Sequence, residues 1–137
     1  MVDRLFAYGT LLVPELLCAV LGRALSGVPA VLPGYARFRV RRAAYPAIVG
    51  QPGATTHGEL FTGIVAPEWN ALDDFESSLY ERHEVRVRLP DESIIEAHTF
   101  VVADPFRHRL TDEPWDLENF RRKHLDRYLT RLGSGRV

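Results

Sequence analysis

The sequence contains a single cysteine, Cys18, among its 137 residues. One cysteine cannot form an internal disulfide, and no other cysteine or histidine stands at metal-ligand spacing from it, which disfavours a structural zinc site. The five histidines are scattered along the chain, so we predict that the protein binds no metal. Cys18 lies among leucines and a valine, and we predict that it is a small residue of the core.

The chain also lacks an excess of charge of either sign. Its 17 lysines and arginines nearly balance 18 aspartates and glutamates, which gives a formal net charge of -1. With no whole-molecule field to attract nucleic acid or an anionic membrane, we expect neither as a partner. A small neutral or zwitterionic molecule fits this composition better, and nothing in the sequence indicates an oligomeric state.

Long hydrophobic runs are missing as well. The longest apolar stretches, residues 6–12 and 94–102, are too short or too interrupted to span a bilayer, and residues 1–4 are not followed by the apolar core of a signal peptide. We therefore expect a cytoplasmic protein. Its length and its hydrophobic content of 46% predict one globular domain over residues 1–132, with a flexible C-terminal tail over residues 133–137.

Strand and helix signals alternate along the chain. A short buried strand is predicted over residues 4–8, and Pro14 begins a helix that stops at Gly22. We further predict turns at residues 33–34 and 50–53, strands over 35–40, 56–65, 84–89 and 94–102, and helices over 67–76 and 116–132. This pattern favours an α+β fold, with a curled or barrel-like sheet and flanking helices.

Glu76 is the most informative residue, because it is a carboxylate at a core position of a predicted helix. At about 100° per residue, it projects between Trp69 and Leu72 in the apolar stripe. Burial and the negative end of the helix dipole both disfavour the ion, so we expect a raised pKa, which suits proton transfer near neutral pH. A buried ion pair with Arg82 is the alternative, and spacing does not decide between the two.

Two separated motifs resemble those of the γ-glutamylcyclotransferase-like family, including its plant avirulence-induced branch. The first is Tyr-Gly-Thr-Leu at residues 8–11, and the second is Leu-Asp-Asp-Phe-Glu-Ser-Ser-Leu-Tyr-Glu-Arg at residues 72–82. Four residues recur by chance, whereas the two motifs together at family-like spacing are specific. The agreement extends over nearly the whole domain, through residues 45–49, 57–60, 115–120 and 124–125.

The resemblance implies a small mixed β-barrel with flanking helices, in which a cavity separates the first motif from the glutamate of the second. It implies that Glu76 is the general acid/base, that Tyr80 lies in the pocket and that Arg82 supports the motif. Ser77 stands where many relatives carry glycine, which bears on the room beside Glu76. Substrate-binding roles fall to the residues of the first motif, Tyr8, Gly9, Thr10 and Leu11.

The first motif also has a physical role of its own. Backbone N–H groups that are released where a strand turns toward the helix at Pro14 can hold a carboxylate, and Gly9 permits close approach. The alternative is an ordinary strand-to-helix turn. Only the partner motif at Glu76 favours a site over a turn.

The activity that the resemblance implies is the intramolecular cyclisation of a γ-glutamyl amide to 5-oxoproline, with release of an amine or amino acid and no cofactor. The α-amine of the substrate is the nucleophile, which agrees with the absence of a Gly-x-Ser-x-Gly motif. The sequence does not identify the leaving amine. Two alternatives stay open: a non-catalytic module that binds an amino-acid-like ligand, and removal of a γ-glutamyl protecting group from a biosynthetic intermediate.

Overall fold

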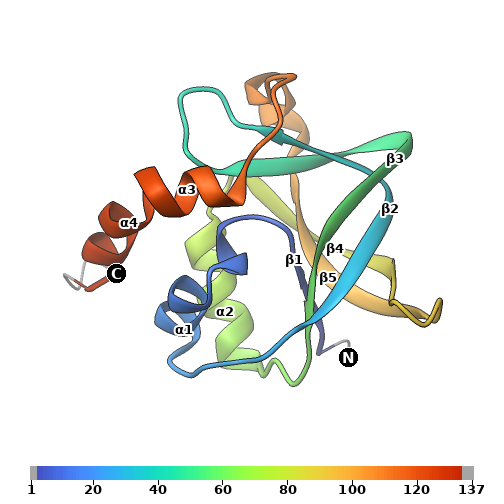
Figure 1. Cartoon of the computed structure of the whole chain (residues 1–137), viewed down its shortest axis with the longest axis horizontal. Helices are drawn as coiled ribbons and strands as arrows, with labels where there is room; N and C mark the ends of the chain where they lie inside the picture. Colours follow the sequence, from blue (N-terminus) through green and yellow to red (C-terminus); the bar gives the residue numbers. More distant parts are fainter. Residues whose placement is uncertain (1–2, 134–137) are drawn as a thin grey trace.

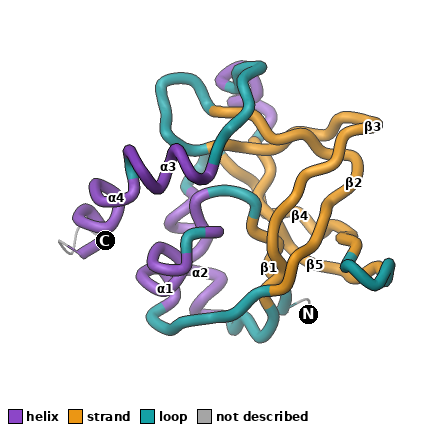
Figure 2. The backbone as a smooth tube through the Cα atoms, in the orientation of Figure 1, coloured by secondary structure: helices purple, strands orange, loops and turns teal. Residues whose placement is uncertain are grey.

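Five strands form a closed barrel in the computed structural model, which describes residues 3–133 (Figures 1 and 2). The strand order is β1-β3-β2-β4-β5; neighbouring strands are antiparallel except for the pair that closes the barrel, β1 and β5, which is parallel. This confirms the predicted α+β fold with a mixed barrel. The strands are β1 (Leu5–Ala7), β2 (Val28–Arg39), β3 (Pro46–Phe61), β4 (Tyr80–Arg88) and β5 (Ile94–Val102).

The longer helices gather on one side of the barrel, next to the end of β1 (Figure 1). A proline in the first turn begins each of the two helices that follow β1 and β3, as predicted for residues 14–21 and nearly so for 67–76. Within residues 3–133, no helix is long and apolar enough to cross a membrane. The helices are η1 (Thr10–Leu12), α1 (Pro14–Leu21), α2 (Ala66–Glu76), η2 (Asp104–Arg109), α3 (Leu117–Lys123) and α4 (Leu125–Gly133).

The shortest strand, β1, is buried along its whole length and pairs with β3 on one side and β5 on the other. Gly58 of β3 lies so close to it that a β-carbon at this position would stand 2.1 Å from the carbonyl oxygen of Ala7. Only a residue without a side chain allows this approach. Gly58 is therefore a condition for closing the barrel at β1.

An apolar layer outside the barrel fixes the helices against β1. Leu11 and Leu17 from the N-terminal segment pack with Trp69 and Leu72 of α2 and with Phe100 of β5. All five side chains are buried, and burial of this kind contributes roughly 1.5–3 kcal/mol for each large apolar side chain. This layer sets where the C-terminal end of α2 lies relative to the segment that follows β1.

The turns predicted at residues 33–34 and 50–53 are wrong. Both segments lie within long paired strands, where the register shifts between Pro33 and Tyr35. Gly34 has a φ of +85° and Gly53 a φ of +86°, so each glycine bends its strand at this irregularity and does not reverse it. The predicted strands over 35–40 and 56–65 consequently overlap the longer β2 and β3, which end at Arg39 and Phe61, and residues 62–65 are not part of a strand.

The helix predicted over residues 116–132 is two helices, because the backbone at His124 leaves the helical region with a φ of −129°. The buried residues of this segment, Phe120 and Leu125, pack with Trp115 against the start of α1. The helix α4 continues to Gly133, and residues 134–137 of the predicted flexible tail lie outside the described residues.

Cys18 is exposed, so its predicted place in the core is wrong. The buried face of α1 is formed by Leu16 and Leu17. Because successive residues of a helix turn by about 100°, Cys18 falls on the outward side although its neighbours in sequence are apolar.

Candidate active site

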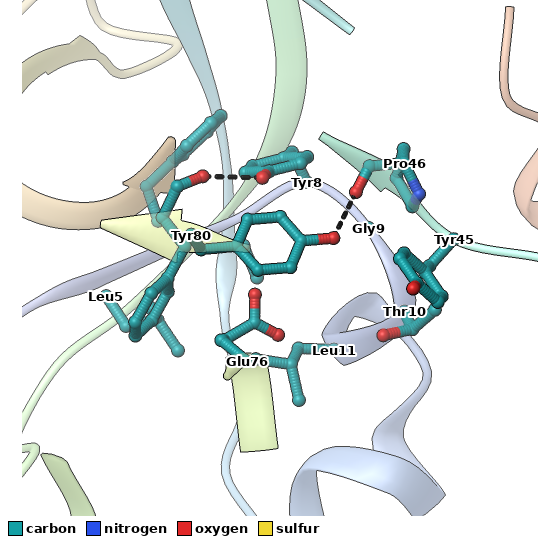
Figure 3. Close-up of a pocket in the computed structure, with 12 residues that line it drawn as sticks. Leu5, Tyr8, Gly9, Thr10, Leu11, Tyr45, Pro46, Glu76 and Tyr80 are labelled. Carbon is teal, nitrogen blue, oxygen red and sulfur yellow. Dashed lines mark hydrogen bonds between the residues drawn. The ribbon is translucent and has the colours of Figure 1, made fainter. Parts of the chain in front are cut away.

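A small cavity lies at the end of β1, between residues 8–11 and the C-terminal end of α2 (Figure 3). Its volume is about 20 Å³, which is room for about one water-sized group. The structure thus brings together the two motifs that the sequence separates. The wall contains all of the predicted site residues other than Arg82, namely Tyr8, Gly9, Thr10, Leu11, Glu76 and Tyr80.

We call this small cavity the inner cavity. A larger cavity of about 510 Å³, the outer cavity, lies beside it and is lined by α1, α2 and α4. Glu76 belongs to the walls of both cavities and therefore stands at their junction. The shared wall also includes Thr10, Tyr45 and Tyr80. The rest of the wall of the outer cavity is largely apolar or aromatic. Its residues, which do not line the inner cavity, are Ala19, Val20, Ala71, Asp74, Phe75, Ser77, Tyr128, Arg131 and Leu132.

Glu76 is the last residue of α2, and its carboxyl is directed toward the ring of Tyr80, with Leu11 beside it (Figure 3). Burial raises the pKa of this carboxyl from an ordinary value of 4.5 to about 8. The rise has the direction that the helical pattern predicts. Because removal from water is its cause, the carboxyl is poised to hold or release a proton near neutral pH.

Arg82 does not form the ion pair with Glu76 that was the alternative interpretation. Its guanidinium stands 3.7 Å from the carboxylate of Asp73 and lies over the ring of Trp69, 4.8 Å from the ring centroid. Both partners belong to α2, one turn and two turns before Glu76. Arg82 therefore ties β4 to α2 without neutralising the buried carboxylate.

Two tyrosine hydroxyls of the inner cavity donate to backbone carbonyls. The Tyr8 hydroxyl donates to the oxygen of Phe100 at 2.5 Å, and the Tyr80 hydroxyl donates to the oxygen of Pro46 at 2.6 Å. Burial, and after it the charge of Glu76, raises the pKa of both phenols well above the usual range. Both groups are therefore neutral at physiological pH, and the Tyr80 oxygen keeps lone pairs that can accept a hydrogen bond from a ligand.

The backbone at Gly9 lies close to another residue of the protein, Pro46. A β-carbon at this position would stand 2.9 Å from Cγ and 3.1 Å from Cδ of Pro46. Pro46 also accepts the hydrogen bond of Tyr80, so the first motif and the second motif meet on the same residue. The absence of a side chain at Gly9 thus permits the loop to pack on β3, in addition to any role toward a ligand.

Sequence reasoning missed several wall residues. Tyr45 and Pro46 belong to a stretch that agrees with the family, and the helical patterns predict that Phe75 and Tyr128 are core residues. Both aromatic residues are half-buried and line the outer cavity. A helical stripe does not distinguish a side chain that faces the core from one that faces a cavity, because both follow the same period.

Among residues 3–133, no three His, Cys, Asp or Glu side chains gather as a metal site.

Comparisons with known proteins show what the chain resembles in sequence and in fold. Protein AIG2 C of Arabidopsis thaliana is 32% identical over 127 residues, which cover 92% of this chain and 76% of that protein. AIG2-like protein C of the same plant is 35% identical over 92% of this chain and 73% of its own length. The solution structure of another Arabidopsis thaliana protein, 28% identical, superimposes with a TM-score of 0.73 and covers 94% of this chain and 87% of that one.

A gamma-glutamyl cyclotransferase structure shares the fold with a TM-score of 0.65, at 18% identity over 75% of this chain and 68% of that chain. The sequence profile of the family described as gamma-glutamyl cyclotransferase, AIG2-like, matches residues 5–119, which include both motifs. The chain therefore belongs to the gamma-glutamyl cyclotransferase, AIG2-like family.

Proposed function

We propose that the protein is an enzyme that cyclises the γ-glutamyl group of an amide to 5-oxoproline and releases an amine or amino acid, with Glu76 as the general acid/base. The observation that carries this proposal is the carboxyl of Glu76, whose pKa of about 8 places it between protonation states near neutral pH, at the junction of two cavities. Residues 8–11 face it across the inner cavity (Figure 3).

The proton balance of the reaction suits this carboxyl. A free α-amino group has a pKa of about 7.7–8.0, so the substrate arrives largely as an ammonium ion at neutral pH. Because the pKa of Glu76 is about 8, a proton passes between the two groups with little change in free energy. The ionised form of Glu76 takes the proton from the ammonium and leaves a neutral amine that can attack.

The bond changes follow from this transfer. The α-nitrogen forms a bond to the γ-carbonyl carbon, Glu76 gives its proton to the leaving nitrogen, and the bond from that carbon to the leaving nitrogen breaks. The second proton that the α-nitrogen loses on becoming the lactam N–H passes through Glu76 to the released amine, which departs as an ammonium ion. The substrate carries its own nucleophile, so the reaction needs neither a cofactor nor a nucleophilic side chain. We propose that the protein performs it in the cytoplasm on a small molecule, without nucleic acid or membrane as a partner.

The two cavities suit the two ends of such a substrate. The inner cavity, at about 20 Å³, has room for about one oxygen of the α-carboxylate at the glutamyl end. The outer cavity, at about 510 Å³, has room for the leaving amine. We propose that Tyr8, Gly9, Thr10 and Leu11 hold the glutamyl end, and that the Tyr80 oxygen accepts a hydrogen bond from the α-nitrogen.

The test measures 5-oxoproline release from a panel of γ-glutamyl compounds by the wild type and by Glu76→Gln. Glutamine keeps the size of the side chain but carries no exchangeable carboxyl proton, so turnover is expected to fall by roughly 10²-fold or more. Glu81→Gln is the matched control, since the Glu81 side chain is exposed and 57% accessible. Full turnover by Glu76→Gln contradicts the acid/base role, and tight binding without product favours a binding module.

A further inference from the structure

Arg37 of β2 is a half-buried cation that the reaction above does not use. Its Nη1 donates hydrogen bonds to two backbone oxygens, at 2.7 Å to Tyr8 and at 3.3 Å to His57. The guanidinium lies over Trp115, 5.7 Å from the ring centroid. Among residues 3–133, no carboxylate lies within ion-pair distance of Arg37. Burying a charge without an opposite charge costs free energy. Because Arg37 has no ion pair within the described residues, the cost of its partly buried place must be offset by other contacts.

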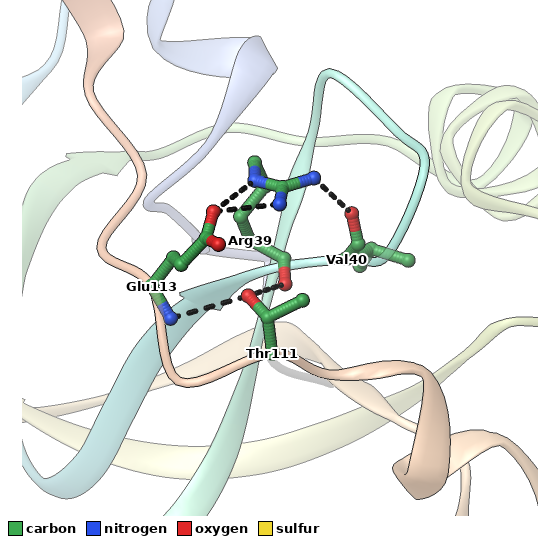
Figure 4. Close-up of polar contacts among 4 residues, drawn as sticks. All are labelled: Arg39, Val40, Thr111 and Glu113. Atoms are coloured by element: carbon green, nitrogen blue, oxygen red, sulfur yellow. Dashed lines mark hydrogen bonds and ion pairs between the residues drawn. The ribbon is translucent and has the colours of Figure 1, made fainter.

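Arg39, two residues further along β2, shows what an ordinary arginine of this strand does (Figure 4). Its Nε and Nη2 donate to one carboxylate oxygen of Glu113 at 3.0 Å and 2.6 Å, and its Nη1 donates to the oxygen of Val40 at 3.2 Å. These contacts fasten the segment after η2 to the barrel. Arg37 has no such acidic partner and instead holds the first motif.

The contact with Tyr8 orients the peptide group between Tyr8 and Gly9. This peptide is trans, so its carbonyl and its N–H point in opposite directions. Arg37, which holds the carbonyl, lines neither cavity, whereas Gly9 lines the inner one. The Gly9 N–H therefore points away from Arg37, and Gly9 itself lines the inner cavity.

The Gly9 N–H is also without a partner inside the described chain. Gly9 is buried, and among residues 3–133 no backbone oxygen accepts its N–H. A buried N–H without an acceptor is costly, and in folded proteins such groups are paired with protein, water or ligand. An acceptor that enters the inner cavity would supply the missing partner.

We propose that Arg37 is a positioning residue that aims the Gly9 N–H at the α-carboxylate of the ligand, and this inference rests on the proposed function. The guanidinium polarises the Tyr8–Gly9 peptide, which strengthens its N–H as a donor. Its positive charge, one peptide group away, also favours an anion in the inner cavity. Since the carboxylate does not react, its binding is the same in the ground state and in the transition state and changes KM more than kcat.

The first experiment compares Arg37→Met with the matched control Arg39→Met. In Arg37→Met we expect KM for a γ-glutamyl substrate, and Kd for 5-oxoproline measured by calorimetry, to rise by roughly tenfold, with kcat within about twofold of the wild type. In Arg39→Met both constants are expected to stay within about twofold. Arg37→Lys keeps a charged donor and is expected to give intermediate values, which provides a second variant if methionine disturbs folding.

The second experiment follows the Gly9 amide by ¹H–¹⁵N NMR. Loss of the guanidinium contact is expected to move this resonance upfield in Arg37→Met and to leave it unmoved in Arg39→Met, and 5-oxoproline is expected to move it downfield in the wild type. An unmoved Gly9 resonance, or a loss confined to kcat, overturns the inference. If the wild type and Arg39→Met release no 5-oxoproline, the proposed function fails, while the response of the Gly9 amide still decides the role of Arg37.

Discussion

The hydroxyl of Tyr80 donates a 2.6 Å hydrogen bond to the carbonyl oxygen of Pro46, the residue on which Gly9 packs. This bond joins the start of β4 to the start of β3, directly beside Glu76 (Figure 3). It uses the hydroxyl proton of Tyr80 and leaves the oxygen as an acceptor. The site therefore presents acceptors, at Glu76 and Tyr80, where the α-ammonium of the proposed substrate would lie.

Tyr80→Phe removes this bond and leaves the buried oxygen of Pro46 without its donor. We expect a loss of about 1–3 kcal/mol in the free energy of unfolding, together with a fall in kcat/KM of roughly tenfold. Urea denaturation and 5-oxoproline release measure the two effects. Tyr35→Phe is the control, because among residues 3–133 no hydrogen bond joins the Tyr35 hydroxyl to a protein group. Equal losses in both variants would show that the hydrogen bond to Pro46 contributes nothing specific.

The pH dependence of kcat/KM is expected to follow Glu76. The productive encounter joins ionised Glu76 to a substrate ammonium, so activity rises with pH up to the Glu76 pKa of about 8 and declines where the substrate amine loses its proton. Below pH 7 the acid limb should fall by about tenfold per pH unit. Initial rates between pH 5 and 10 test this, and a flat profile between pH 6 and 8 would contradict the assignment.

Glu76→Gln is expected to stabilise the fold at alkaline pH. The unfolded chain releases the Glu76 proton near pH 4.5, whereas the folded protein keeps it up to about pH 8. Because the folded state holds more protons in this window, the wild type loses at most about 1.4 kcal/mol of stability per pH unit as pH rises, and the glutamine variant does not. Urea denaturation at pH 5, 7 and 9 measures the difference, which should widen with pH; a constant difference would show that Glu76 ionises normally.

Gly9→Ala is expected to displace the first motif, because a β-carbon would stand 2.9 Å from Cγ of Pro46. Crowding of this kind costs about 1–3 kcal/mol of stability, and we expect kcat/KM to fall by roughly tenfold or more. Gly50→Ala is the matched control, since a β-carbon at Gly50 meets nothing within 4 Å. Thermal unfolding and 5-oxoproline release distinguish the two, and a Gly9→Ala variant with wild-type activity would contradict the packing role.

Local sequence patterns predicted the features that are formed by residues close together in the chain. The proline at the first turn of α1, the apolar stripe of α2 and the hairpin of β4 and β5 all belong to this class. The turn predicted at residues 33–34 is a bend within β2, because glycine with positive φ occurs in both and only the partner strand distinguishes them. The last predicted helix is interrupted at His124, where the backbone has a φ of −129°, and the helical period does not report this.

The candidate site likewise has some features that the sequence predicts and others that it does not. The pattern around Trp69 and Leu72 was enough to predict a raised pKa for Glu76, since burial on a helix follows its period. The partner of Arg82 was not predictable, because Asp73 and Glu76 both belong to the helix that precedes it and only the folded geometry selects Asp73. The contact between Arg37 of β2 and Tyr8, the residue after β1, joins positions 29 residues apart, and no local motif reports it.

The parallel pairing of β1 with β5 has a consequence for how the protein acquires activity. The hydroxyl of Tyr8 reaches the carbonyl of Phe100 across 92 positions of the chain, so Tyr8 finds this partner only after the intervening segment has been made. Contacts of such long sequence separation are slow to form. The loop that would grip a substrate is thus completed late in folding, and the appearance of turnover during refolding would mark the closure of the barrel.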